Sequence, residues 1–97
     1  MRLIWSPESR RVLLQIREEI TQSASEERSL AVIDRLRERV LQLLHTPRIG
    51  RRVEPELRDD FRVIAARPRW VYYRIRADTI EVVSIKHYRQ EDALRAE

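Results

Sequence analysis

The apolar residues of the chain change their spacing along its length, and this spacing predicts the order of helices and strands. Residues 2–5, Arg-Leu-Ile-Trp, favour β-structure and stop at a Ser-Pro pair, which predicts a short strand. Ser6 can then cap a helix that has Pro7 at its first position, where the missing amide hydrogen of proline is not needed. Apolar residues next recur every three or four positions over 12–20 and over 30–44. This period predicts two helices.

A short polar segment at 23–25 separates the two helical patterns, and Ser23 with Glu26 has the spacing of a capping box. Because each helix has one apolar face and the connection is short, we expect an antiparallel helical hairpin. Beyond residue 60 the apolar residues alternate with polar ones, which is typical of strands. Short turns join three such runs, so we expect an antiparallel meander at 61–65, 70–75 and 80–85.

Two irregular features accompany these elements. The alternation slips between Val82 and Val83, which indicates a bulge or a strand that is covered on both faces. Residues 46–60 form a long loop, and loops of this length in small domains are often functional. The sequence therefore predicts an α+β fold in a single domain, residues 1–97: an N-terminal strand, then an α-helical hairpin packed on an antiparallel sheet of three to four strands.

Composition excludes several classes of function. The 97 residues include no Cys and only two His, so we expect no disulfide, no structural metal site and no cofactor. A single Gly does not allow a glycine-rich phosphate loop. The chain has neither an apolar run of the roughly 20 residues that a membrane helix needs nor a secretory signal, so we expect a cytoplasmic protein without a membrane partner.

Positive charge is concentrated in the middle of the chain. The net charge is +4, but residues 46–76 alone contain 9 Arg against 4 acidic residues. Of the 20 basic residues, 19 are Arg and only Lys86 is Lys. Arginine favours planar, bidentate contacts with carboxylates or phosphates, although an arginine-rich genome would give part of the same bias. The middle segment is therefore the candidate contact region for an acidic partner.

Four short strings carry a resemblance to a known family. They are Leu-Ile-Trp-Ser-Pro at 3–7, Thr-Pro-Arg-Ile-Gly-Arg at 46–51, Arg69 with Tyr-Arg-Ile at 73–75, and Ile-Lys-His at 85–87 followed by Arg89. Their order and spacing resemble the ParE/RelE superfamily of bacterial toxins over most of the chain. The sequence departs from the ParE-like pattern at Pro68, where an aromatic residue is usual, and at Tyr88, where a small residue often follows the histidine.

The resemblance to the ParE branch implies a toxin that inhibits DNA gyrase by protein–protein contact. It also implies a cognate antitoxin, a small DNA-binding protein whose flexible tail wraps the toxin, and assembly as a homodimer or as a heterotetramer with the antitoxin. Candidate antitoxin contacts are Trp70, Tyr72 and Arg74. The candidate contacts with the target are basic residues of the central and C-terminal segments: Arg51, Arg62, Arg69, Arg74, His87 and Arg89.

The His-Tyr pair at 87–88 is instead similar to the RelE/YoeB branch, which cleaves messenger RNA on the ribosome. On that reading Glu54 or Glu56 is the general base, His87 an acid or base, and Tyr88 a stacking platform for a nucleobase. Arg62 and Arg69 would clamp the phosphate. Each of these residues also has a plain structural explanation, as a strand-end histidine, a solvated ion pair or a core aromatic. A third alternative is an inert homologue that only binds antitoxin.

Overall fold

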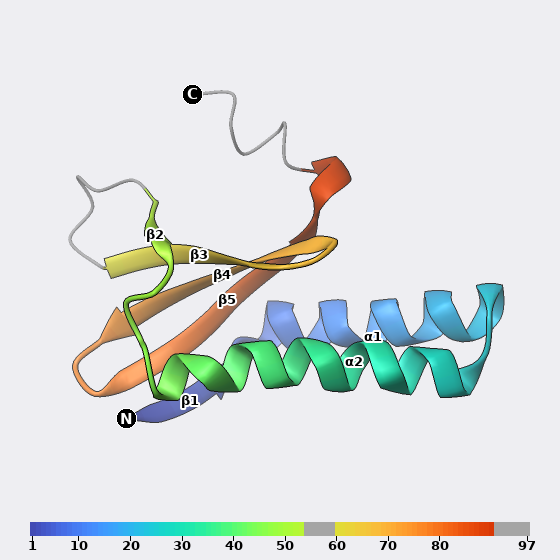
Figure 1. The fold of residues 1–97 in the computed structure, drawn as a ribbon, viewed down its shortest axis with the longest axis horizontal. Helices are drawn as coiled ribbons and strands as arrows, with labels where there is room; N and C mark the ends of the chain where they lie inside the picture. Colours follow the sequence, from blue (N-terminus) through green and yellow to red (C-terminus); the bar gives the residue numbers. More distant parts are fainter. Residues whose placement is uncertain (54–59, 91–97) are drawn as a thin grey trace.

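The N-terminal part of the protein forms a strand and a helical hairpin. The computed structural model describes residues 1–53 and 60–90. Strand β1 (Arg2–Trp5) leads directly into helix α1 (Pro7–Ser23), and a tight connection joins α1 to helix α2 (Glu26–Leu41). The two helices pack side by side and run antiparallel, which confirms the predicted hairpin (Figure 1).

Serine side chains cap both helices. Ser6 accepts a hydrogen bond on Oγ from the backbone N–H of Ser9 at 3.0 Å, and Pro7 is the first residue of α1, as the sequence predicts. The cap of α2 differs from the prediction. Ser25 accepts from the N–H of Arg28 at 3.0 Å, whereas Ser23 is the last residue of α1, so it is too early in the chain to cap α2.

The rest of the described chain builds one five-stranded sheet. A short 3-10 helix η1 (Gln42–Leu44) follows α2, and the elements after it are β2 (Arg51–Arg52), β3 (Asp60–Ala66), β4 (Arg69–Arg76), β5 (Thr79–His87) and the 3-10 helix η2 (Tyr88–Gln90). The strand order is β1-β5-β4-β3-β2. The pairs from β5 to β2 are antiparallel, as predicted for the meander, and β1 joins parallel to β5. Sequence did not predict β2, because two residues cannot display a period.

The helices cover one face of the sheet, and the core lies between them (Figure 1). Alternate residues of β4 supply its centre: Val71 and Tyr73 are fully buried and Ile75 almost so. They form one cluster with buried residues of the hairpin, η1, β3 and β5: Ile16, Ile33, Leu36, Val40, Leu43, Ile64, Ile80, Val82 and Ile85. Each helix thus turns its predicted apolar stripe to the core, except that Leu30 and Leu44, at the ends of the second stripe, are 43% and 37% exposed.

Strand β5 contains the irregularity that the sequence indicates. Tyr73 pairs with Val82 while its neighbour Tyr72 pairs with Ser84, so Val83 is the extra residue of a bulge. Ser6 bonds to this bulge: its Oγ donates to the carbonyl oxygen of Val83 at 2.8 Å. The start of α1 is therefore fixed to the middle of the sheet. In the described ranges, no helix is long and apolar enough to cross a membrane.

Candidate functional site

Three arginines gather around one carboxylate where β2 meets the beginning of β3. Asp60 lies 2.9 Å from Nε of Arg62, 3.5 Å from Nε of Arg52 and 3.6 Å from Nε of Arg48. The β2–β3 pairing sets this geometry, because Arg52 is the register partner of Arg62. We call these four residues the arginine cluster. These four side chains, taken by themselves, are three guanidinium groups and one carboxylate, so their summed charge is positive.

The loop that carries Arg48 is held by two side chains of the sheet. Arg62 donates from Nη1 to the carbonyl oxygens of Gly50 at 2.8 Å and Arg48 at 3.1 Å. The Tyr73 hydroxyl donates to the carbonyl oxygen of Pro47 at 2.7 Å and accepts from the N–H of Gly50 at 3.0 Å. The side chain of Arg48 nevertheless stays 65% exposed, against 15% for Arg62. Arg62 therefore supports the loop, and Arg48 faces solvent.

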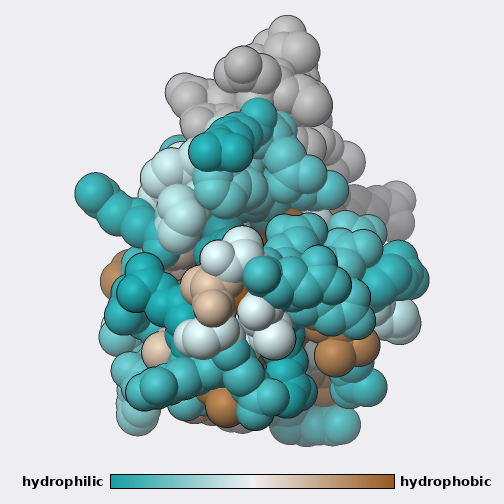
Figure 2. Space-filling model, turned by 90° about the vertical axis from the view of Figure 1, so that its right-hand side faces the viewer, coloured by the Kyte–Doolittle hydropathy of each residue, from teal (hydrophilic) through white to brown (hydrophobic). Residues whose placement is uncertain are grey.

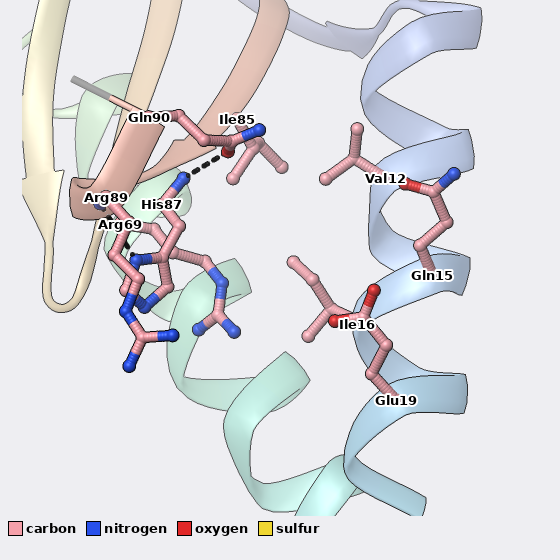
Figure 3. A pocket seen from close by; sticks show the side chains of 9 residues that line it. All are labelled: Val12, Gln15, Ile16, Glu19, Arg69, Ile85, His87, Arg89 and Gln90. Carbon is pink, nitrogen blue, oxygen red and sulfur yellow. Dashed lines mark hydrogen bonds between the residues drawn. The ribbon is translucent and has the colours of Figure 1, made fainter. Parts of the chain in front are cut away.

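A second basic site lies at the other end of the sheet. A pocket of about 330 Å³ opens between α1 and the last residues of β5, and we call it the α1 pocket (Figure 3). Its walls are Val12, Gln15, Ile16 and Glu19 from α1, and Arg69, Ile85, His87, Arg89 and Gln90 from the sheet and η2. The helix and the sheet thus supply opposite walls, with the basic side chains on the sheet wall (Figure 3).

Strand pairing brings Arg69 and His87 together, because they are register partners in the β4–β5 ladder. Arg69 is on the helix-facing side of β4 and is partly buried. Burial lowers the pKa of its guanidinium, and the negative charge of Glu19 offsets part of this effect. Among the described residues, the guanidinium of Arg69 has no hydrogen bond or ion pair.

Hydrogen bonds at the end of β5 fix the imidazole of His87. The backbone N–H of Arg89 donates to Nδ1 of His87 at 3.1 Å, and the backbone N–H of His87 donates to Oε1 of Gln90 at 2.8 Å (Figure 3). Because Nδ1 accepts a hydrogen bond, the neutral ring carries its hydrogen on Nε2. His87 can therefore act as a donor from Nε2.

The predicted antitoxin contacts lie on the sheet face away from the helices. Trp70, Tyr72 and Arg74 alternate along β4 with the core residues and therefore share this opposite face. Arg74 donates from Nε to Glu81 at 2.6 Å. The ring of Trp70 packs against that of Tyr88 with 4.8 Å between centroids. This face combines aromatic rings with a paired arginine.

The structure distributes the predicted target contacts over three places. Arg62 and Arg69 are at opposite ends of the β3–β4 ladder, since Arg62 pairs with Tyr73 and Arg69 with Ala66. Four residues of strand separate these rungs, about 13 Å, and Arg62 bonds to Asp60 and to the carbonyl oxygens of Arg48 and Gly50. Of the other candidates, Arg74 and the exposed Arg51 are on the sheet face away from the helices, His87 and Arg89 line the α1 pocket with Arg69, and Tyr88 packs against Trp70.

Two predicted residues lie outside the described part of the chain, and several residues of the two basic sites were not predicted from the sequence. Glu54 and Glu56, the predicted general bases, lie outside the described residues. Sequence reasoning missed Arg48, Arg52 and Asp60 in the arginine cluster, and Glu19 in the α1 pocket. Glu19 was detectable in principle, because it is three residues beyond Ile16 on the helix and so lies close to its apolar stripe.

Hydrophobic side chains accompany both basic sites: Ile49, next to Arg48, is 56% exposed, and Val12, Ile16 and Ile85 line the α1 pocket. Hydrophobic side chains appear only as small separate patches on the side of the molecule that carries the tip of the hairpin (Figure 2). Over residues 1–53 and 60–90, no group of three or more His, Cys, Asp or Glu could hold a metal ion. What these sites offer a ligand is positive charge and hydrogen-bond donors.

Comparisons with known proteins agree on one family. A family model described as the ParE toxin of the type II toxin-antitoxin system parDE matches residues 3–92. Among solved structures, the chain is similar to one titled "Chromosomal ParDE TA system from P. aeruginosa", with a TM-score of 0.77. Sequence identity is 19%, and the match covers 90% of this chain and 95% of that chain, a likeness of fold. The comparison with curated proteins gave no match.

Proposed function

Because the chain belongs to the family of ParE toxins of type II toxin-antitoxin systems, we propose that it inhibits DNA gyrase by direct protein contact in the cytoplasm. The observation that carries this proposal is the arginine cluster. Its three guanidinium groups lie around the carboxylate of Asp60, and one of them, on Arg48, is largely exposed. Such a surface favours an acidic patch on a larger protein and speeds the encounter with it.

The fixed backbone of the loop at residues 47–50 should make the binding of an acidic partner more specific. Tyr73 and Arg62 fix the backbone of residues 47–50, so the loop loses little conformational freedom when it binds. Arginine forks held in this way can pair with carboxylates in bidentate geometry. We place the contact with gyrase at Arg48, Arg51 and Arg52, and assign Arg62 to supporting the loop.

A cognate antitoxin neutralises the toxin in this proposal. Trp70, Tyr72 and Arg74 offer it an aromatic and basic face, and the strands β1 and β2 are edges to which an extended tail can add a strand. Acidic residues of the tail would be drawn to the basic sites of the toxin. Assembly as a homodimer, or as a heterotetramer with the antitoxin, belongs to the same proposal.

Purified components test the gyrase contact. Toxin is added to gyrase, relaxed plasmid and ATP, and supercoiling is followed on agarose gels with and without a cognate antitoxin. We expect loss of supercoiling that the antitoxin prevents. Undiminished supercoiling at a large excess of toxin would contradict the gyrase proposal.

A second candidate function is the cleavage of messenger RNA on the ribosome, as in the RelE branch. The pairing of Arg69 with His87 in the α1 pocket favours it, because this places a cation and a titratable ring around one space. On translating ribosomes, this candidate predicts cut messenger RNA by primer extension, and loss of the cuts in His87→Gln. Intact messenger RNA with wild-type toxin would remove it.

A further inference from the structure

A tight turn carries the chain from the end of the helical hairpin to the edge of the sheet, between η1 and β2 (Figure 1). The N–H of Ile49 donates to the carbonyl oxygen of Thr46 at 3.2 Å, which closes a β-turn over residues 46–49. Pro47 is its second residue, a position that suits proline because the ring fixes φ there. The turn is therefore restricted by its own sequence before any partner binds.

Two side chains of the sheet hold this turn by its carbonyl oxygens. Tyr73 donates to Pro47, and Arg62 donates to Arg48 and Gly50. Gly50 lies so close to Tyr73 that a Cβ atom there would be 2.6 Å from the hydroxyl oxygen. The absence of a side chain at Gly50 thus lets the turn rest directly on a buried tyrosine. This contact makes the turn a rigid part of the sheet edge.

Ile49 exposes a large aliphatic side chain on this rigid turn. It is 56% exposed, and its neighbour Arg48 is exposed as well. A single exposed aliphatic side chain is common on protein surfaces. Over residues 1–53 and 60–90, however, seven large hydrophobic side chains are exposed, and three of them, Leu41, Leu44 and Ile49, lie within one stretch of nine residues. Apolar exposure is therefore concentrated in the segment that leads to the arginine cluster.

The apolar and the charged side chains of this segment can make different contributions to binding. Exposed arginines accelerate the encounter with an acidic surface, but salt screens them and each exposed ion pair stabilises a complex only weakly. An aliphatic side chain that enters a pocket of the partner is removed from water, and this favours the complex in proportion to the area buried. Because the turn is already fixed, Ile49 loses little conformational freedom on binding. Ile49 has the exposure and the rigidity that such a contact requires.

We propose that Ile49 inserts into an apolar pocket of the target protein, beside carboxylates of that protein that pair with Arg48 and Arg52. The inference rests on the proposed function, in which the target is gyrase, and adds an apolar contact to the basic surface. Charge selects this occupant, because Arg48 and Arg52 both lie within 3.6 Å of Asp60 and place two cations next to the turn. The partner surface is therefore an apolar pocket with an acidic border.

Biolayer interferometry with immobilised gyrase tests this inference, with the toxin in solution. We expect Ile49→Ala to weaken binding about tenfold, mainly through faster dissociation, because the aliphatic contact is lost. Leu14→Ala is the matched control, since Leu14 is a similarly exposed aliphatic residue, at 59%, on α1. It should leave the affinity nearly unchanged. Ile49→Leu keeps the volume of the side chain and should bind almost as well as the wild type.

Salt separates the apolar contact from the charged ones. Raising the salt concentration from about 0.05 M to about 0.3 M shortens the screening length, so the effect of Arg48→Gln on the association rate should shrink. The effect of Ile49→Ala on the dissociation rate should persist, because the burial of apolar surface does not depend on charge. An effect of Ile49→Ala that disappears at the higher salt concentration would contradict an apolar contact.

Failure of this inference can be distinguished from failure of the gyrase proposal. If wild-type toxin binds gyrase and Ile49→Ala binds as tightly, or if Leu14→Ala weakens binding equally, the inference is overturned and the gyrase contact stands. If wild-type toxin does not bind gyrase, both are overturned. A loss in Ile49→Ala that is larger for a cognate antitoxin than for gyrase would assign Ile49 to the antitoxin and would also overturn the inference. Circular dichroism and thermal unfolding establish that each variant is folded.

Discussion

At the level of single residues, Tyr73 anchors the loop that carries Arg48. Its hydroxyl is buried and bonds to Pro47 and Gly50, so Tyr73→Phe leaves the buried N–H of Gly50 without an acceptor. We expect the free energy of unfolding to fall by about 1–3 kcal/mol, measured by urea denaturation. Tyr88→Phe is the control, because the Tyr88 hydroxyl has no hydrogen bond to the described residues, and it should cost less. Equal losses in the two variants would contradict this role of Tyr73.

The same tyrosine makes stability depend on alkaline pH. Burial raises the pKa of the Tyr73 phenol above its ordinary value of 10.0, although the bond from Gly50 and the charge of Arg62 lower it in part. The unfolded chain ionises first, so this contribution to stability is complete below about pH 10 and is lost as pH rises through the folded pKa. Urea denaturation at about pH 8 and about pH 11 should show wild-type stability falling more than that of Tyr73→Phe. Parallel losses would contradict this assignment.

Replacing Arg69 or Arg74 of β4 by an uncharged residue should have different effects on the stability of the protein. Arg69→Met removes a partly buried charge that has no ion pair in the described chain, so stability should stay equal or rise by up to about 1 kcal/mol. Arg74→Met breaks the 2.6 Å contact with Glu81, and stability should fall. Thermal unfolding measures both. A larger loss in Arg69→Met than in Arg74→Met would mean that Arg69 is satisfied within the molecule.

At the level of elements, Ser6 joins the start of α1 to the bulge of β5. Its Oγ accepts from Ser9 and donates to Val83, and its N–H donates to the carbonyl oxygen of Val82 at 2.9 Å. Ser6→Ala removes both side-chain bonds and should destabilise the protein by about 1–2 kcal/mol in urea denaturation. The cap of α2 at Ser25 has no such link to the sheet, so Ser25→Ala should cost less. The reverse order would show that the link to the bulge contributes nothing.

Sequence predicted those elements whose apolar residues repeat. Both helices, the three-stranded meander and the slip at Val83 follow from periods of 3.6 and 2, and the N-terminal strand follows from a β-favouring run that stops at Ser6-Pro7. Strand β2 and the parallel pairing of β1 could not be predicted in this way, because they depend on partners far along the chain. The arginine excess was visible in composition, whereas the α1 pocket was not. Its facing residues Glu19 and Arg69 are brought together only when the hairpin docks on the sheet.

At the level of the whole molecule, the sheet separates two basic sites. The arginine cluster lies where β2 meets the start of β3, and the α1 pocket lies where β4 begins and β5 ends. Helices cover one face between them, and the face with Trp70 and Tyr72 is opposite (Figure 1). The two basic sites and the aromatic face are therefore separate surfaces of the molecule.

Inhibition of gyrase by a variant of the arginine cluster is the decisive measurement. In the double variant that combines Arg48→Gln and Arg52→Gln, Asp60 keeps its contact with Arg62, so the fold should persist. Arg2→Gln with Arg10→Gln removes the same charge from exposed residues elsewhere. We expect the concentration that halves supercoiling to rise about tenfold in the first variant and to change little in the second. Equal inhibition by both variants and the wild type would contradict contact through the arginine cluster.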